Sequence, residues 1–212
     1  MPTHGKLRLL ALRDQTDAHA QTMDRERERF TALAGREPVR AVSAFNLFQT
    51  PEAIADMMVR EAFIMDGMRI LEPSAGLGRI YRAIRHRTDA HVTLVEIAPQ
   101  CAAELYRETQ ADQQASLIQD DFLRCDATRL GGLFDVVVMN PPFKNAMDIK
   151  HIRHALTMLK PGGKIVSLCY AGPRQRAAFE NVDGWNWMQL DPGSFRSEGT
   201  GADVAMITKV ME

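Results

Sequence analysis

The stretch from Phe134 to Phe143, FDVVVMNPPF, places the strongest constraint on the fold of this 212-residue chain. Its apolar run, Val136 to Met139, is followed at once by an asparagine and two prolines. A short run rich in β-branched residues and ended by prolines is typical of a strand buried on both faces, as in the middle of a parallel sheet. The chain is therefore expected to be an α/β protein with helices on both faces of its sheet.

The tetrapeptide Asn140-Pro141-Pro142-Phe143 would follow the carboxyl end of that strand, where open α/β sheets bind their ligands. The two prolines fix φ at successive positions and remove two backbone donors. The loop is therefore expected to be stiff and to hold Asn140 in one orientation, with an aromatic face beside the amide.

Short apolar runs and helical periodicities alternate through the rest of the chain. Further strands are predicted at residues 68–71, 91–97, 115–119, 164–170, around 187–190 and at 204–208. Helices are predicted after residues 50 and 76, at 98–109, from about 149 to 159, and near 174–179. The sequence Lys160-Pro161-Gly162-Gly163 is expected to end the fourth of these helices with a turn.

The strand at 68–71 runs into Glu72-Pro73-Ser74-Ala75-Gly76-Leu77-Gly78, and a helix is predicted directly afterwards. Small residues between a strand and a helix let a ligand lie against the backbone at the amino end of the helix. Glu96 lies at the tip of the next strand, 18 residues beyond Gly78, where an acid can accept hydrogen bonds from both hydroxyls of a ribose. This order of elements predicts a nucleoside-binding site.

The acid at the start of the turn narrows the choice of nucleoside. Glu72 would repel a pyrophosphate but would suit a ligand that carries an ammonium or sulfonium group. The sequence therefore favours S-adenosylmethionine over NAD as the cofactor.

Two other segments each allow a functional and a purely structural interpretation. Thr50 is expected to be the N-cap and Pro51 the first residue of a helix whose apolar positions extend to Met65, and that helix could simply be well capped. Asp121 could accept a hydrogen bond from an adenine amine while Phe122 covers the ring, or the segment could be a polar turn.

Composition excludes several classes of protein. The apolar fraction of 45% and charged fraction of 25% match ordinary soluble proteins, and the net charge of -1 gives no overall signature of nucleic-acid binding. Without an apolar run of membrane-spanning length or a signal segment, the chain is expected to be cytoplasmic and away from membranes. Cys101, Cys125 and Cys169 lack metal-ligand or disulfide spacing, so no metal is expected.

Residues 1–40 are rich in charge and include the alternating segment Asp24 to Arg29. Such alternation usually forms a solvated helical face, although this arm could also dock on a partner or touch nucleic acid. The chain is therefore divided into a helical arm at 1–40 and a main domain at 41–212. It is expected to be a monomer or a homodimer formed through the arm.

Taken in order, FQTP, EPSAGLG, VEI, DDF, NPPF and LKPGG resemble the motifs of class I S-adenosylmethionine-dependent methyltransferases. More narrowly, the chain resembles the amino-methyltransferases with an (N/D)PP(Y/F) signature, in the motif order of the gamma group of DNA adenine-N6 methyltransferases. The resemblance covers about residues 45–210. It implies a Rossmann-like, mostly parallel sheet of seven strands whose last strand is antiparallel.

The resemblance also assigns roles to individual residues. Cofactor contacts are implied for Phe48, Thr50, Pro51, Glu72, Pro73, Ser74, Ala75, Gly76, Gly78, Glu96, Ile97, Asp121, Phe122 and Asn140. The implied catalytic loop is Asn140, Pro141, Pro142 and Phe143. Contacts to the substrate are expected from Phe143, Lys144, Arg174, Phe195 and Arg196, although each of these cations could also be an ordinary solvated charge.

The activity implied is methyl transfer to the N6 amine of adenine in DNA, after the base is flipped out of the duplex. RNA is also a possible partner, and an RNA amino-methyltransferase or a protein glutamine N5-methyltransferase remains the enzyme alternative. A cofactor-binding accessory subunit is the alternative without catalysis. Gamma-type DNA enzymes usually carry a separate recognition domain, whereas only about 40 residues follow the strand at 164–170 here.

Overall fold

The computed structural model describes Asp24, Arg25, Glu28 and residues 49–212 of the chain. Those three isolated residues have helical backbone and exposed side chains. The rest of the expected arm at 1–40 lies outside the described residues, and so does Phe48. Within the described part, no helix has the length and apolar character that crossing a bilayer requires.

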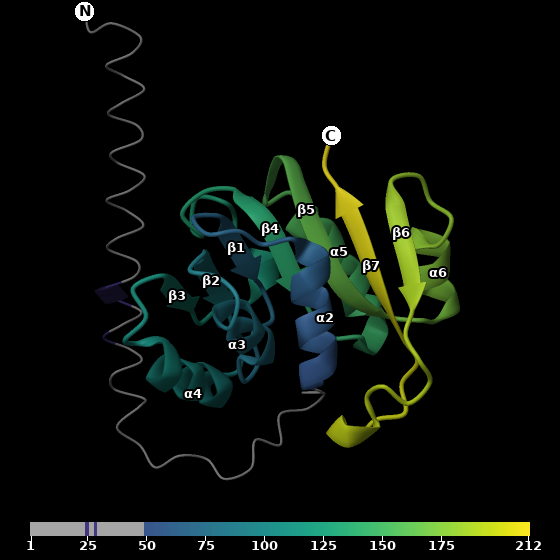
Figure 1. The fold of residues 1–212 in the computed structure, drawn as a ribbon, viewed down its shortest axis with the longest axis horizontal. Helices are drawn as coiled ribbons and strands as arrows, with labels where there is room; N and C mark the ends of the chain where they lie inside the picture. The colour runs from purple at the N-terminus through teal and green to yellow at the C-terminus, as the bar shows by residue number, and fades with distance from the viewer. Residues whose placement is uncertain (1–23, 26–27, 29–48) are drawn as a thin grey trace, which may run out of the picture.

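Helices and strands alternate along the described chain (Figure 1). The helices are α2 (Glu52–Ala62), α3 (Arg79–Arg85), α4 (Pro99–Thr109), α5 (Met147–Leu156) and α6 (Pro173–Phe179), with short 3-10 turns η1 (Phe122–Arg124), η2 (Lys144–Ala146) and η3 (Arg196–Glu198). The strands are β1 (Arg69–Glu72), β2 (His91–Val95), β3 (Ala115–Ile118), β4 (Phe134–Met139), β5 (Leu159–Tyr170), β6 (Trp185–Gln189) and β7 (Val204–Val210).

These strands form one sheet in the order β3-β2-β1-β4-β5-β7-β6. Strands β1 to β5 pair in parallel, whereas β7 lies between β5 and β6 and is antiparallel to both. This confirms the expected Rossmann-like sheet of seven strands with an antiparallel last strand. β4 has parallel neighbours on both sides, as its continuous apolar sequence predicted.

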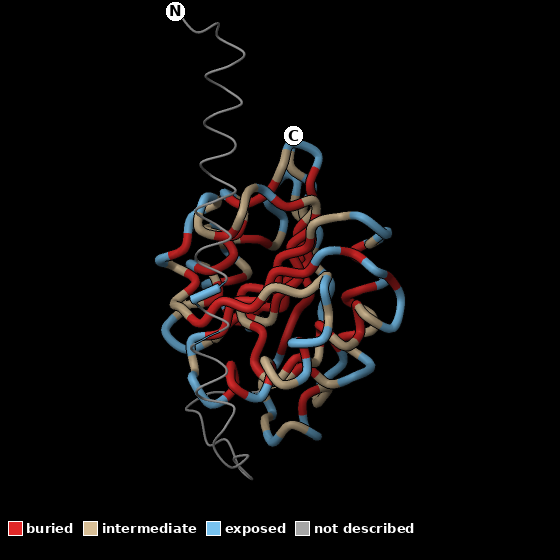
Figure 2. The backbone as a smooth tube through the Cα atoms, turned by 90° about the vertical axis from the view of Figure 1, so that its left-hand side faces the viewer, coloured by how far each residue is buried: buried red, intermediate tan, exposed pale blue. Residues whose placement is uncertain are grey.

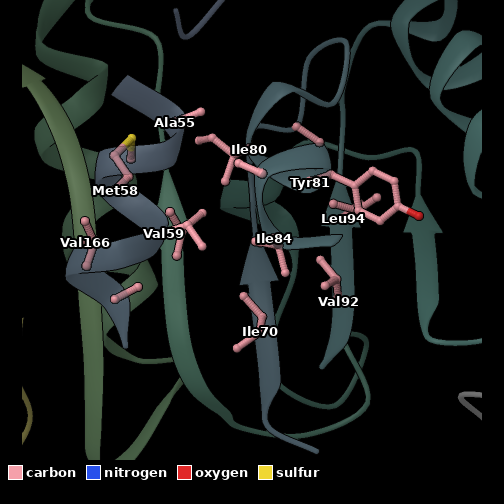
Figure 3. Packing of buried hydrophobic residues seen from close by; sticks show 14 of the residues in the cluster. Ala55, Met58, Val59, Ile70, Ile80, Tyr81, Ile84, Val92, Leu94 and Val166 are labelled. Atoms are coloured by element: carbon pink, nitrogen blue, oxygen red, sulfur yellow. The ribbon is translucent and has the colours of Figure 1, made fainter. Parts of the chain in front are cut away.

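Alternate residues of β4 enter different cores. Val136 and Val138 belong to the cluster under α2, α3 and α4, whereas Val137 and Met139 belong to the cluster under α5 and α6. Figure 3 shows the first cluster, with side chains of α2 and α3 packed over β1, β2 and β5. Figure 2 shows that buried residues concentrate along the central strands. Helices therefore cover both faces, and a continuous apolar strand is stable only in such a layer.

The order of the strands fixes where a ligand can bind. β1 and β4 are neighbours, but the chain continues from β1 toward β2 and β3 on one side and from β4 toward β5 on the other. Open α/β sheets bind ligands in the crevice at such a switch point, outside the carboxyl ends of the strands. The start of α2 and the η3 segment lie at this same end of the sheet (Figure 1).

Two local expectations were wrong. Residues 160–163 do not end a helix, because α5 ends at Leu156 and these residues form a bulge within β5. The bulge is held by hydrogen bonds between Gly162 N–H and Met211 O, 3.0 Å, and between Met211 N–H and Gly163 O, 2.8 Å. The helix after residue 50 ends at Ala62, so the exposed Met65 lies beyond its apolar face.

Candidate active site

A cavity of about 320 Å³ opens at the carboxyl ends of β1 to β4. Its size is within the range of small-molecule and cofactor sites. Most of the site residues that the sequence predicted line this cavity. They are Thr50, Glu72, Pro73, Ser74, Ala75, Gly76, Glu96, Ile97, Asp121, Phe122, Asn140, Pro141, Pro142, Phe143 and Lys144. These expected residues, which lie up to 94 positions apart in the sequence, therefore share one cavity.

Several wall residues were not expected. They are Gln49, Leu77, Arg79, Ile80, Ala98, Asp120, Met147 and His151. Most adjoin an expected residue in sequence and could have been found by extending the motifs. Met147 and His151 are different, because they come from α5 and only the spacing i, i+4 places them on one helical face.

The glycine-rich turn is held against β2 by a buried carboxylate. Glu96 Oε2 accepts a hydrogen bond from Gly76 N–H, and Glu96 Oε1 accepts one from Ala98 N–H, both at 2.7 Å. These bonds fix the acid at the end of β2 beside the turn that follows β1. The acid that was expected to bind a ribose is thus oriented by hydrogen bonds from the protein backbone.

Glu72 lies in the same wall with a buried carboxylate. Its side chain is 1% exposed, and Oε2 has no hydrogen-bond partner among the described residues. Burial raises the pKa of Glu72 well above its usual value, and the nearby Glu96 carboxylate raises it further. Burial also raises the pKa of Glu96. The Arg82 charge acts in the opposite direction on Glu72, but burial is the largest cause. Two buried acids in one wall make the cavity suited to a positively charged ligand.

Asp121 and Phe122 form the wall next to the end of β3. Asp121 Oδ1 accepts a hydrogen bond from Leu123 N–H, 3.0 Å, which caps η1 and fixes the side chain. The Phe122 ring is buried, and the His154 ring contacts it edge-on at a centroid distance of 4.8 Å. A carboxylate and an aromatic ring held in this way can bind one edge and one face of a purine.

The loop after β4 brings Asn140 to the start of α2. Asn140 Nδ2 donates a hydrogen bond to Thr50 Oγ1, 3.1 Å, across 90 residues of sequence. The expectation that Thr50 caps α2 was wrong, because the cap position is Pro51 and no side chain caps the helix. The Thr50 hydroxyl is instead an acceptor for the asparagine amide. Asn140 Oδ1 is the acceptor atom of that side chain.

Phe143 and Lys144 continue this wall. The Phe143 ring is half-buried and packs against the core under α2 and α3, and the Lys144 side chain is exposed. An aromatic ring therefore lies beside the oriented amide, and a cation follows it in the chain. This arrangement suits a planar base with a phosphate attached nearby.

Among the described residues, five that were expected at the site do not line the cavity. Gly78, with φ +79°, begins α3, and a Cβ there would lie 2.7 Å from Leu105 Cδ1, so the left-handed backbone and the close packing against Leu105 both favour glycine. Pro51 O begins the hydrogen bonding of α2. The Phe195 ring is 1% exposed within the core under α2 and α3, so its expected role as a face for a base is wrong. Arg174 and Arg196 are exposed outside the cavity wall.

Comparison with known families gives an independent line of evidence. The sequence pattern of the methyltransferase small domain family matches residues 52–182 of the chain. An rRNA N6-adenosine methyltransferase of Caenorhabditis elegans is 26% identical over 138 residues. That match spans 61% of this chain and 64% of the relative.

Solved structures share the fold at low sequence identity. A candidate RNA methyltransferase from Pyrococcus horikoshii superposes with a TM-score of 0.62 at 17% identity, over 87% of this chain and 98% of that one. TrmN from Thermus thermophilus superposes with a TM-score of 0.59 at 18% identity, over 86% of this chain and 52% of that one.

Proposed function

Because this chain belongs to the methyltransferase small domain family, among the class I S-adenosylmethionine-dependent methyltransferases, we propose that it methylates the N6 amine of adenine in RNA. The methyl donor is S-adenosylmethionine, which supplies an electrophilic methyl group on a positively charged sulfonium. Binding of this donor is proposed for Glu72, Gly76, Glu96 and Asp121. Their carboxylates and small backbone turn suit its cationic amino-acid end, its ribose and its adenine.

The observation that carries the proposal is the hydrogen bond from Asn140 Nδ2 to Thr50 Oγ1 in the wall of the cavity. An adenine amine is a poor nucleophile, because its lone pair is delocalised into the ring. Asn140 Oδ1 and the Pro141 carbonyl are proposed to accept its two hydrogens, which draws the nitrogen toward tetrahedral geometry and exposes its lone pair. Holding the amide in one orientation before binding makes this interaction available without reorganisation.

Phe143 is proposed to stack on the target base, a contact of about 1–3 kcal/mol in nucleic-acid complexes. No strong base lies in this loop, and none is needed before transfer, because the methylated amine loses its proton to water afterwards. The prolines at 141 and 142 keep the loop stiff, and Pro141 is itself buried. The protein therefore contributes mainly position and hydrogen bonding.

RNA is favoured by the Caenorhabditis elegans relative, which is an rRNA N6-adenosine methyltransferase. RNA also presents unpaired adenines in loops and bulges, which can enter a cavity without a base pair being broken. DNA is the second candidate, because the FQTP element precedes the glycine-rich turn as in the gamma group of DNA enzymes.

The test is transfer of a labelled methyl group to purified RNA, duplex DNA and protein extract in parallel. Label recovered as N6-methyladenosine in the RNA is the expected result. Label confined to DNA would select the second candidate, and label confined to protein would exclude both nucleic-acid activities.

Asn140→Ala should lower transfer on the order of 10²-fold or more, because an oriented hydrogen-bond acceptor is lost, and should leave affinity for S-adenosylhomocysteine nearly unchanged. Asn145→Gly is the matched control, since Asn145 is exposed just beyond the loop and has φ +58°, which glycine adopts readily. Unchanged transfer by Asn140→Ala would remove the catalytic role proposed for this residue.

A further inference from the structure

Helix α5 directs one titratable side chain into the cavity wall. Met147 and His151 lie one helical turn apart and both line the cavity, whereas Ile152 and Ala155 are buried in the core on that side of the sheet. His151 is only 7% exposed. No cofactor or substrate contact described above uses it.

The imidazole of His151 is incompletely hydrogen bonded. Its Nδ1 is buried and has no hydrogen-bond partner among the described residues. Leaving a buried polar atom without a partner costs stability, so such atoms in folded proteins call for an explanation. In a cavity wall, a ligand that completes the hydrogen bonding is a direct explanation.

The neighbours of His151 show which part of a ligand it would meet. Its ring centroid lies 5.7 Å from that of Phe122, and the carboxylate of Asp121 is close enough to act on it electrostatically. Burial lowers the pKa of His151 to about 4, with the Asp121 charge raising it and the His154 charge lowering it. The ring is therefore neutral near pH 7, with one N–H donor and one acceptor nitrogen.

We propose that His151 is a specificity-determining residue whose imidazole forms a hydrogen bond to the adenine base of S-adenosylmethionine. Asp121 is proposed to accept a hydrogen bond from the adenine amine, and His151 lies beside it with polar capacity that the protein does not use. Adenine offers ring-nitrogen acceptors and a second amine hydrogen, either of which a neutral imidazole can bind. This inference rests on the identity of the cofactor and is independent of the polymer that is methylated.

His154 provides an internal comparison on the same helix. Its Nε2 lies 2.8 Å from the Cys125 carbonyl oxygen, and it does not line the cavity. The two histidines therefore contact the same Phe122 ring but differ in whether the protein completes their hydrogen bonding. Replacement by phenylalanine should therefore affect ligand binding at His151 and protein stability at His154.

The test is calorimetric binding of S-adenosylhomocysteine without substrate. The panel includes analogues in which one ring nitrogen is replaced by CH or the 6-amino group by hydrogen. His151→Phe keeps a flat ring but removes both nitrogens, and it should weaken binding of S-adenosylhomocysteine roughly 3- to 10-fold, the range for one net hydrogen bond. One analogue should bind the wild-type protein as weakly as S-adenosylhomocysteine binds His151→Phe. The affinity of that analogue should not fall further in His151→Phe, because in a double-mutant cycle the loss of one partner of a direct pair removes the whole interaction.

His151→Asn and His151→Gln return a polar group near Nδ1 or Nε2, and one of them should restore part of the affinity. If His151→Phe does not fold, these two variants replace it in the binding test. His154→Phe should lower the melting temperature without changing discrimination between analogues. Wild-type affinity in His151→Phe, or an equal loss for every analogue in all three His151 variants, would overturn the proposal.

Discussion

At the scale of single residues, Glu72 couples the stability of the protein to its affinity for the cofactor. Its raised pKa means that the folded state holds the proton more tightly than the unfolded chain does. Stability from this group is therefore present below its ordinary pKa and is lost as the pH rises through the raised value. Binding of a cationic ligand has the opposite dependence, because it requires the deprotonated carboxylate.

Glu72→Gln should make the free energy of unfolding of the ligand-free protein less dependent on pH. The pH-dependent part of the free energy that the substitution removes is about 1.4 kcal/mol for each unit by which the pKa is displaced. The same variant should bind S-adenosylmethionine more weakly above the raised pKa. Denaturant titrations and calorimetry between pH 5 and 8 measure the two effects.

Glu104→Gln is the control, since Glu104 is exposed on α4, where it pairs with Arg107. This variant should leave both pH dependences as in the wild type. Equal slopes in wild type and Glu72→Gln would show that Glu72 is not the residue that couples stability to ligand charge.

Thr50 permits a second prediction at this scale. Thr50→Val removes the hydroxyl that accepts the Asn140 amide, so kcat should fall about tenfold, the equivalent of one hydrogen bond of about 1.4 kcal/mol. Thr50→Ser should keep most of the activity. A rise in the Kd of the cofactor with unchanged kcat at saturation would instead show that Thr50 acts on the cofactor.

The site residues that sequence could predict are those whose chemistry is tied to a motif. Glu96 and Asn140 stand at the ends of recognisable strands, so the topology alone brings them together. His151 carried no such signal, because a lone histidine in an amphipathic helix gives no information on what faces it. Phe195 was misplaced for a related reason, since its exposure depends on packing between distant segments.

At the scale of elements, the junction between the glycine-rich turn and α3 is set by close packing against α4. Gly78→Ala should lower the free energy of unfolding by roughly 1–3 kcal/mol, from the left-handed backbone and from the contact with Leu105. The change should also weaken cofactor binding, because residues 74–77 line the cavity immediately before α3. Thermal unfolding and calorimetry measure these effects.

Gly67→Ala separates the cost of the left-handed backbone from the cost of the contact with Leu105. Gly67 has φ +77°, similar to Gly78, but a Cβ there would have no atom within 4 Å. It should therefore show only the backbone cost, about 1 kcal/mol, with cofactor affinity unchanged. Similar losses in the two variants would mean that packing against Leu105 does not constrain the turn.

Helices and strands with a regular pattern of apolar residues could be predicted from the sequence, whereas irregular segments could not. The run Val136 to Met139 identified β4 because two covered faces require an uninterrupted apolar sequence. Residues 160–163 contain the usual signals of a helix end, yet hydrogen bonds to Met211 hold them as a bulge in β5. Those partners lie about 50 residues away, beyond any local pattern.

At the scale of the whole molecule, every described strand of the sheet and the described wall of the cavity come from residues 49–212. We therefore propose the division into an arm at 1–40 and a catalytic domain at 41–212. Removal of residues 1–40 should leave the melting temperature nearly unchanged and affinity for S-adenosylhomocysteine within about twofold, a difference below 0.5 kcal/mol.

Removal of residues 1–51 provides the contrast, because it also takes away Thr50 and the Pro51 carbonyl that begins α2. Since α2 covers β4 and β5, loosening its first turn should lower the melting temperature and also release Asn140 from its partner. Methyl transfer should then fall more than cofactor affinity does. A large loss of stability in the shorter deletion would place residues 1–40 within the folded domain and shift its boundary toward the amino terminus.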